Sequence, residues 1–391
     1  MPGDEDNYDL IIVGLGAVGS AAVWHAAELG LRVLGIDRHD PPHKLGSTHA
    51  ETRISRLSVG EGPQYLPIVA RSHEIWADIE QRTGTKLFHQ CGGIILSTAG
   101  AAGGERWGDF VSATSEVAAQ ADVPFERLTT EQARKRHPAV TFHENESIGF
   151  EPTAGLVLAE PAVETQLGLA RFAGADIHVN ETVTALTPDD TGVTVETNAG
   201  TYRAARVIVA AGPWIGEFAP GDAPRLTVTR QVVFWFEAED PAAVSIENLP
   251  FFMCVGDDIE DYHCIFPASL QSPGQLKMMG EQFADITDVA TVERTVSEEE
   301  IASFHRDFVA PRISGVTPNC VRAEVCLYTN TPDEHFLIDA DPRSDRITLM
   351  SPCSGHGFKH STALAEAVVQ TIAGQPSTLD LSPFTRDRLR V

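Results

Sequence analysis

The sequence predicts a two-domain α/β protein. Three observations support this prediction. An apolar run, a glycine-rich turn and an Ala-rich segment follow one another within residues 8–37, and alternating residues at 182–200 lead into a continuous apolar run. With 391 residues, 42% of them hydrophobic, the chain is also long enough for two cores. We expect one domain with a Rossmann-type, largely parallel sheet and a second domain with a mainly antiparallel sheet.

The run YDLIIVGLGAVGSAAVWHAAELGLRVLGIDR predicts a strand, a helix and a second strand. Residues 8–13 are a short apolar run, typical of a buried parallel strand. The Ala-rich helix is expected to end near Leu29, and the second strand to cover Arg32 to Ile36. This order of elements is that of a βαβ unit.

The turn between the first strand and the helix has the pattern G-x-G-x-x-G, formed by Gly14, Gly16 and Gly19. These glycines allow a tight turn, close approach of a diphosphate and close packing of the helix on the strand. Asp37 follows the second strand, where a carboxylate can accept hydrogen bonds from a ribose hydroxyl. An acid at this position disfavours a 2′-phosphate. The unit therefore predicts a dinucleotide, and by itself it leaves FAD and NAD as alternatives.

The segment TVTALTPDDTGVTVETNAGTYRAARVIVAAGPW favours FAD. It predicts a three-strand meander whose last strand ends at Gly212, where the backbone could approach a cofactor. A sheet that begins at residue 8 and resumes near 200 and again after 330 belongs to a discontinuous domain. Such an arrangement is more usual in flavoproteins than in NAD dehydrogenases.

Composition and charge exclude several classes of partner. The formal charge of −26 argues against binding of nucleic acid or of an anionic membrane surface. The acidic start MPGDEDNYDL lacks the features of a signal peptide, and the chain has no apolar run of roughly 20 residues. The six cysteines show neither C-x-x-C nor zinc spacing, so we expect no metal. Reduced thiols in a cytoplasmic protein are the expectation.

Four motifs along the chain are specific enough to compare with known families. They are DPPHKLGSTHAETRISRLSVGEG at 40–62, TRQVVFWFE at 229–237, VCLYTNTPDEHFLID at 325–339 and SGHGFKHS at 354–361. These motifs resemble those of the monomeric sarcosine oxidase and N-methyltryptophan oxidase family of FAD-dependent amine oxidases, which is related to the fructosyl amino acid oxidases. The resemblance covers nearly the whole chain. It implies FAD as cofactor, attached through its 8α-methyl group to Cys326, whereas Cys353 is expected to serve packing.

The G-x-G-x-x-G turn and the resemblance together indicate the cofactor-binding residues. These are Gly14, Gly16, Ala17, Val18, Gly19, Asp37, Arg38, Ser47, Thr48, Thr52, Arg53, Gly212, Cys326, Gly355, Gly357, Phe358 and Lys359.

The resemblance also implies a pocket for an anionic substrate. Arg56 and Lys359 would hold the substrate carboxylate, because an anion in a pocket needs cationic partners. Arg53 would lie near the flavin ring, and His356 near the reacting amine or the flavin.

The resemblance places a lysine on a strand of the substrate domain, near flavin N5, where its charge promotes reduction of O₂. Lys277, one of five lysines, is the expected residue. An alternative alignment on Gly280 would put Met278 there, and a slip of one residue turns a strand side chain to the other face.

The predicted pocket wall differs from that of close sarcosine-oxidising relatives. His263 and Cys264 stand where those relatives have paired tyrosines, and Glu281 stands near the position of a histidine. These three residues are therefore expected to contact the substrate, and sarcosine itself is in doubt. A glutamate four residues after the lysine resembles the fructosyl amino acid oxidases.

The resemblance implies hydride transfer from the carbon next to the amine nitrogen to flavin N5, hydrolysis of the resulting imine, and formation of hydrogen peroxide from O₂. Alternatives are a fructosyl or cyclic imino acid oxidase, a flavin dehydrogenase with another acceptor, and a non-catalytic flavin-binding module. We expect a monomer or small homo-oligomer. The FAD domain is expected to comprise 1–85, 150–220 and 325–391, and the substrate domain 86–149 and 221–324, with the active site between them.

Overall fold

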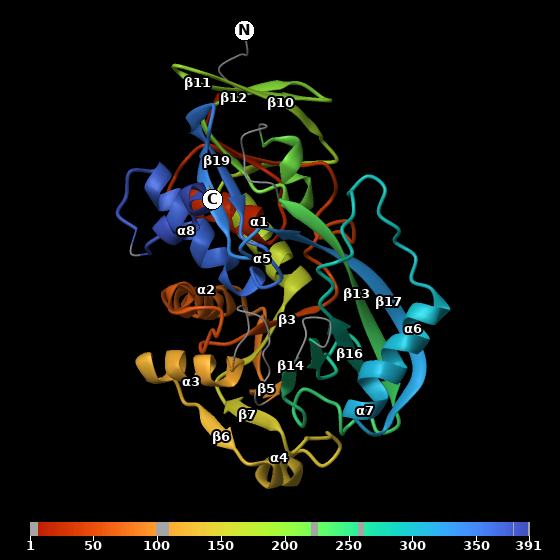
Figure 1. Cartoon of the computed structure of the whole chain (residues 1–391). Helices are drawn as coiled ribbons and strands as arrows, with labels where there is room; N and C mark the ends of the chain where they lie inside the picture. The colour runs from red at the N-terminus through yellow and green to blue at the C-terminus, as the bar shows by residue number, and fades with distance from the viewer. Residues whose placement is uncertain (1–6, 99–108, 220–225, 257–261, 378, 390–391) are drawn as a thin grey trace.

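The structure is a computed structural model, and it describes residues 7–98, 109–219, 226–256, 262–377 and 379–389. The described residues form two eight-stranded sheets and one three-stranded sheet. In Figure 1 the helices α1, α5 and α8 lie against the first sheet in the upper half of the view, and the long strands β13 and β17 run down into the second. Within the described residues, no helix is both long and apolar enough to span a membrane.

The first sheet has a parallel centre. Its order is β10-β11-β12-β1-β2-β9, and β12 also pairs with β19, which pairs with β18. The strands β2, β1, β12 and β19 run parallel, and β9 extends them in parallel beyond β2. The bounds are β1 Asn7–Val13, β2 Val33–Asp37, β9 Asp176–Val179, β10 Val183–Asp189, β11 Gly192–Thr197, β12 Thr201–Val209, β18 Leu337–Asp341 and β19 Ser344–Ser351.

The predicted βαβ unit and the predicted meander are both present. Helix α1 (Ala17–Glu28) connects β1 to β2, and β10, β11 and β12 pair as an antiparallel meander. Helix α1 packs against α5 (Ala159–Phe172) and α8 (Ser361–Ile372), and α2 (Leu66–Thr83) packs on α8. The nearly uninterrupted apolar sequence of β1 is explained by helices on one side and an apolar cluster with the meander on the other.

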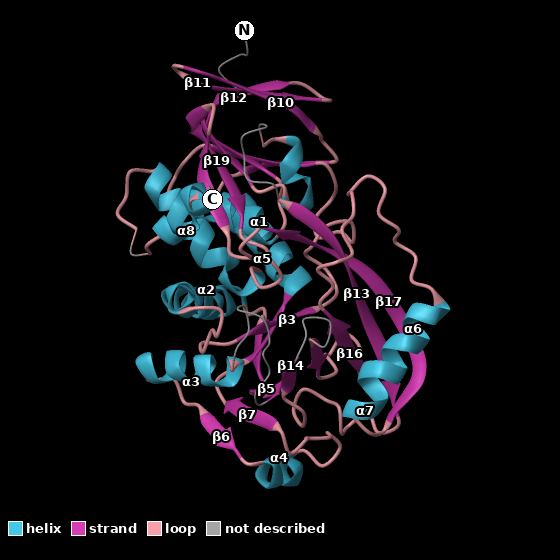
Figure 2. Ribbon diagram, viewed as in Figure 1, coloured by secondary structure: helices cyan, strands magenta, loops and turns pink. Residues whose placement is uncertain are grey.

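The second sheet is antiparallel except for one strand pair. Its order is β17-β13-β16-β15-β14-β5-β7-β6, and β14 and β5 run parallel. The bounds are β5 Gly93–Thr98, β6 Glu126–Leu128, β7 Glu146–Glu151, β13 Thr227–Ala238, β14 Phe251–Val255, β15 His263–Phe266, β16 Gln275–Gly280 and β17 Val316–Asn330. Figure 2 shows β13 and β17 as a long ribbon that extends toward the first sheet.

Smaller elements complete the described chain. The third sheet consists of β3 (Thr52–Ser55), β8 (Gly155–Leu158) and β4 (Phe88–Gln90), in the order β3-β8-β4. The remaining helices are α3 Phe110–Gln120, α4 Thr130–Arg136, α6 Glu298–Phe304 and α7 Ala310–Arg312. The short helices are η2 Pro63–Tyr65, η3 Gly212–Glu217, the π-type η5 His305–Val309, η6 Phe358–His360, η7 Ser382–Phe384 and η8 Arg386–Leu389.

This architecture confirms the predicted fold, a Rossmann-type domain combined with an antiparallel-sheet domain. The first sheet takes strands from three separate parts of the chain, as predicted from the positions of its apolar runs. The domain boundaries themselves stay a prediction. The carboxyl end of β1, where Gly14 follows Val13, and the strands β13, β16 and β17 all contribute to one cavity.

Candidate active site

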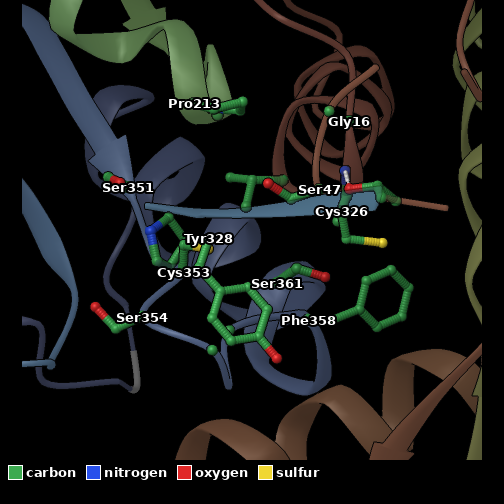
Figure 3. A pocket seen from close by; sticks show the side chains of 18 of the residues that line it. Gly16, Ser47, Pro213, Cys326, Tyr328, Ser351, Cys353, Ser354, Phe358 and Ser361 are labelled. Carbon is green, nitrogen blue, oxygen red and sulfur yellow. Dashed lines mark hydrogen bonds between the residues drawn. The ribbon is translucent and has the colours of Figure 1, made fainter. Parts of the chain in front are cut away.

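One cavity of about 770 Å³ contains most of the predicted site residues. It is lined by the ends of first-sheet strands, by the 38–56 segment and by strands of the second sheet. Figure 3 shows Gly16 and Ser47 on one side of the view, near Cys326, with Tyr328 and Cys353 on the other. A large concave site that gathers polar groups from several elements is the usual form of a ligand site.

The glycine-rich turn fits a dinucleotide diphosphate. A Cβ atom at Gly14 would lie 2.6 Å from the carbonyl oxygen of Ala210, and one at Gly19 only 1.7 Å from that of Gly14. These two glycines therefore allow the helix and the strands to pack closely. At Gly16 the nearest atom would be Thr48 Oγ1 at 3.4 Å, so this glycine leaves its backbone accessible from the cavity. Helix α1 begins at Ala17, whose N–H donates to Thr48 Oγ1 at 3.3 Å, so the positive end of the helix dipole lies beside this turn, where it favours a diphosphate.

Asp37 lies at the end of β2 and lines the same cavity. Its carboxylate accepts hydrogen bonds from the backbone N–H of Leu15 at 2.7 Å and of His39 at 2.8 Å. These bonds fix the acid beside the glycine-rich turn. Arg38 also lines the cavity, where it pairs with Glu217 at 2.6 Å. The position fits the ribose-binding carboxylate that the sequence predicts.

Lys277 extends from β16 into the cavity, whereas Met278 is fully buried in the core of the second sheet. The structure therefore favours the alignment in which the lysine faces the cavity. The ammonium donates hydrogen bonds to the carbonyl oxygens of Ala50 and Thr52 and to Thr52 Oγ1, at 2.7–2.9 Å. Burial, aided by the nearby charge of Arg53, lowers the pKa of Lys277 to about 7.

The carbonyls that receive Lys277 lie in an unusual backbone segment. Ala50 and Glu51 both have positive φ values, 73° and 67°, which are costly for residues with a side chain. The buried Glu51 carboxylate accepts a hydrogen bond from Ser269 Oγ at 2.8 Å and also contacts Ser272 and Arg322. These contacts join the segment to the second sheet and hold the two carbonyls toward Lys277.

Arg53 and the loop before it form another part of the wall. The Arg53 guanidinium donates to the carbonyl oxygens of Ser47, His49 and Thr52, at 2.6–2.9 Å, and lies over the ring of Phe358. The arginine thus fixes the loop at 47–52 and presents a positive charge to the cavity.

Arg56 and Lys359 lie on opposite sides of one carboxylate. Arg56 Nη2 lies 2.6 Å from Glu61 Oε2, and Lys359 Nζ lies 3.3 Å from Glu61 Oε1. Both cations are buried, with 1% and 5% of their surface exposed. Burial raises the pKa of the Glu61 carboxyl, but the two cations outweigh this and hold its pKa well below the usual value. The pair can therefore hold a carboxylate between an arginine and a lysine.

The segment that contains Lys359 approaches the cavity closely. Gly355 has φ +81°, and a Cβ atom at Gly357 would lie 1.6 Å from the carbonyl oxygen of Pro352. The tight turn brings His356 and Phe358 to the cavity wall. The His356 ring packs on Phe336, with centroids 4.7 Å apart, and its Nε2 lies 3.2 Å from a backbone carbonyl oxygen.

Cys326, on β17, lies at the cavity with 4% of its surface exposed. Its Sγ is 3.3 Å from His49 Nε2. Burial raises the pKa of this thiol, but the adjacent His49 outweighs burial and lowers the thiol pKa below its usual value. Cys353 also lines the cavity, and its sulfur accepts a hydrogen bond from the N–H of Thr329 at 3.3 Å.

Two of the predicted site residues do not line the cavity. His263 alternates with Cys264 along β15, so only Cys264 points to the cavity, whereas the His263 ring packs on Phe308 with centroids 5.3 Å apart. The prediction that His263 forms the pocket wall is wrong for this reason. Gly19 is covered by the glycine-rich turn and has the packing role that its position in the pattern indicates.

The remaining predicted site residues also line the cavity. They are Ala17, Val18, Ser47, Thr48, Gly212 and Glu281.

Sequence reasoning missed several residues of the wall. Glu61 was not singled out, although it lies five residues after Arg56 in a quoted motif. Tyr262, Met279 and Tyr328 line the cavity as well. Met279 lies two residues after Lys277 on β16, and Tyr328 two residues after Cys326 on β17. Each therefore points to the same face as its predicted neighbour, so strand periodicity would have found both.

Comparison with known proteins is consistent with this geometry. The family model described as FAD dependent oxidoreductase matches residues 9–371. The chain is 37% identical over 386 residues to N-methyl-L-tryptophan oxidase of Yersinia pestis (strain Pestoides F). The alignment covers 98% of this chain and 100% of the relative.

Solved structures share the fold. NikD, an unusual amino acid oxidase essential for nikkomycin biosynthesis, superposes with a TM-score of 0.83 at 22% identity, over 97% of each chain. Glycine oxidase from Geobacillus kaustophilus gives a TM-score of 0.78 at 19% identity, over 97% of this chain and 98% of that one. Together with the match over residues 9–371 and the curated relative, these findings place the chain in the FAD-dependent oxidoreductase family, within the sarcosine oxidase and N-methyltryptophan oxidase group that its motifs resemble.

Proposed function

We propose that this protein oxidises the secondary amine of an N-substituted amino acid with FAD and O₂. The products are an imine, which water hydrolyses, and hydrogen peroxide. Bound FAD supplies the redox chemistry, because no amino-acid side chain accepts electrons from an amine in this way. The curated relatives are named N-methyl-L-tryptophan oxidases, which makes N-methyl amino acids the first candidates.

The observation that carries this proposal is the pair Arg56 and Lys359. Arg56 and Lys359 each form an ion pair with one oxygen of Glu61 inside the cavity. A substrate carboxylate needs ion pairs of the same kind. Two cations around one acid leave a net positive charge. Because that charge is buried, it attracts a second carboxylate more strongly than it would in water. Binding the carboxylate here orients the rest of the amino acid.

Part of the cavity wall suits an apolar amino-acid side chain. Met253, Phe266 and Met279 contribute apolar surface, and Tyr262 and Tyr328 contribute rings. Such walls gain free energy by covering apolar groups of the substrate. An N-methyl amino acid with a large apolar side chain therefore fits better than sarcosine, which has no side chain.

Lys277 supports the assignment of O₂ as the electron acceptor. Its ammonium is buried at the cavity and stabilises negative charge that develops on O₂ as it is reduced. A dehydrogenase that passes electrons to another acceptor does not need this charge. Arg53, near the same wall, adds to the positive potential.

We further propose that the flavin is attached through its 8α-methyl group to Cys326. The support is the thiol's position at the cavity beside His49. We also propose a cytoplasmic monomer or small homo-oligomer that binds no nucleic acid and no membrane. The charge of −26 supports the absence of nucleic-acid and membrane binding, because both of these partners are anionic and are repelled.

A second candidate is oxidation of a fructosyl amino acid. The specific observation is Glu281, whose carboxylate lines the cavity close to Gly355. A carboxylate is a strong acceptor for sugar hydroxyl groups, whereas it gains nothing from an apolar side chain.

An anaerobic screen tests these assignments. Purified enzyme is mixed with N-methyl amino acids, cyclic imino acids and fructosyl amino acids, and loss of the visible absorbance of the oxidised flavin is followed. We expect N-methyl amino acids with large apolar side chains to reduce the flavin fastest, and matched amines without a carboxylate to reduce it slowly. If no amine reduces the flavin, the protein is a flavin-binding module and the proposal fails. Reoxidation in air by stopped flow then distinguishes an oxidase from a dehydrogenase.

A further inference from the structure

A chain of three side chains leads from the surface to the thiol of Cys326. Glu324 and Cys326 lie two residues apart on β17, so their side chains point to the same face. His49, from the segment before β3, lies between them. Its Nδ1 is 3.2 Å from Glu324 Oε2, and its Nε2 is 3.3 Å from Cys326 Sγ. The order carboxylate, imidazole, thiol is that of an activated nucleophile.

The surroundings favour charge separation along this chain. His49 is 1% exposed, and the Glu324 side chain is 10% exposed. Burial alone would lower the pKa of His49, but Cys326 and Glu324 outweigh it and raise the pKa to about 9. Of the six cysteines, all within the described residues, Cys326 has its pKa lowered, whereas burial raises the thiol pKa of the other five.

We propose that Glu324 and His49 form a relay that activates Cys326 for attachment of the flavin. This inference rests on the proposed covalent attachment and adds the residues that bring it about. His49 Nε2 takes the thiol proton, and Glu324 holds the Nδ1–H of the imidazole, so that the ring stays oriented and its charge is stabilised. Glu324 is a positioning residue, because it acts through His49.

Attachment breaks one S–H bond of Cys326 and one C–H bond of the 8α-methyl group, and it forms one S–C bond. The two electrons and two protons that are released reduce one O₂, the oxidant already used in the proposed reaction, to hydrogen peroxide.

Arg53 helps to set the relay in place. Its guanidinium donates to the backbone carbonyl oxygen of His49 at 2.6 Å, and its charge lies near the Cys326 sulfur and lowers the thiol pKa further. Lys44 contacts the other oxygen of Glu324 at 2.5 Å, but its side chain is 69% exposed and it does not contact His49. Lys44 therefore offers a matched control on the same carboxylate.

The test follows covalent flavin in the full chain. Wild type, Glu324→Gln, His49→Asn and Lys44→Met are purified at fixed times after induction. Total FAD is measured by absorbance, and the covalent fraction by intact mass and by flavin fluorescence on a denaturing gel. We expect His49→Asn to slow attachment about a hundredfold and Glu324→Gln about tenfold, with FAD still bound reversibly. Lys44→Met should attach flavin as wild type does.

The outcomes separate this inference from the proposal on which it rests. If wild-type protein carries no covalent flavin, the proposed attachment itself is wrong. If the wild type is labelled, and Glu324→Gln and His49→Asn both attach flavin as fast as the wild type does, the relay is wrong. If Lys44→Met loses as much as Glu324→Gln, or if Glu324→Gln no longer binds FAD, then Glu324 anchors the 44–49 loop, and the relay is again overturned.

Discussion

The side-chain ammonium of Lys277 lies 2.7 Å from the backbone carbonyl oxygen of Thr52. Two further acceptors, Ala50 O and Thr52 Oγ1, complete the three that an ammonium can use. Lys277 lies on β16 of the second sheet, Thr52 lies on β3 of the third sheet, and Ala50 lies just before β3. The hydrogen bonds therefore place one positive charge at a fixed point of the cavity wall.

Replacing this charge should separate the two half-reactions. In Lys277→Met, anaerobic reduction of the flavin by substrate should change little, whereas reoxidation by O₂ should slow about a hundredfold or more, because one preorganised charge is lost. Stopped-flow measurements of each half-reaction provide the check. Equal loss in both would indicate a structural role, and no loss in either would contradict the placement of the oxygen site at Lys277.

The pH dependence of the oxygen step should follow Lys277. Burial lowers its pKa to about 7, so the ammonium is charged below that pH and neutral above it. The reoxidation rate of the wild type should therefore fall as pH rises through about 7, and the rate of Lys277→Met should stay flat over the same range. Reoxidation measured from pH 6 to pH 9 tests this, and a wild-type rate that rises with pH would refute it.

Substrate affinity should depend on Lys359. In Lys359→Ala the substrate carboxylate loses one of its two buried cationic partners, which should raise KM on the order of a hundredfold. The matched comparison is an amine of the same shape without a carboxylate, whose rate should be low in the wild type and little changed by the substitution. If such an amine is oxidised as fast as the parent amino acid, Arg56 and Lys359 do not bind the carboxylate.

Much of this site could be predicted from the sequence, because short local patterns indicate many of its residues. The glycine spacing at 14–19 requires a specific packing of α1 on the sheet. The quoted motifs contain Arg56 and Lys359, the family resemblance indicated Lys277, and all three residues line one cavity. His263 was misplaced because strand alternation depends on register, and register is set by pairing with β14 and β16, distant in sequence.

Glu61 could not be assigned from the sequence for another physical reason. An acid in a chain of charge −26 is most often a solvated surface group, and only the fold shows that this one lies buried between two cations. The relation of His49 to Cys326 could not be predicted for the same reason. The two residues are 277 positions apart in the sequence, and only the fold brings them, with Glu324, into contact.

The carboxylate of Glu61 should matter for stability. Glu61→Gln leaves Arg56 and Lys359 buried without their acid, which should lower the free energy of unfolding by about 3 kcal/mol. Acetate should restore part of this loss, because a carboxylate that binds the folded state stabilises it. Thermal unfolding with and without acetate is the measurement, with chloride at equal ionic strength as control. A variant as stable as wild type would show that Glu61 does not compensate these charges.

The flavin must be assigned to one of the three thiols that line the cavity, Cys264, Cys326 and Cys353. Cys326 lies within one of the motifs described above, and Cys353 directly precedes another. Cys326 lies beside His49, whereas Cys353 has its pKa raised by burial and accepts a hydrogen bond from a backbone N–H. A thiolate is the nucleophile in such chemistry, so only Cys326 is activated.

Wild-type protein should therefore stay yellow after acid precipitation and carry the mass of one FAD. Cys326→Ser should release its flavin on denaturation, although it should still bind FAD, because Gly14, Gly16 and Asp37 are unchanged. Cys353→Ser is the matched control and should keep the label. Peptide mapping of the labelled protein decides the point: a flavin on Cys353, or a wild-type flavin that washes out on denaturation, would show that the thiol beside His49 is not the point of attachment.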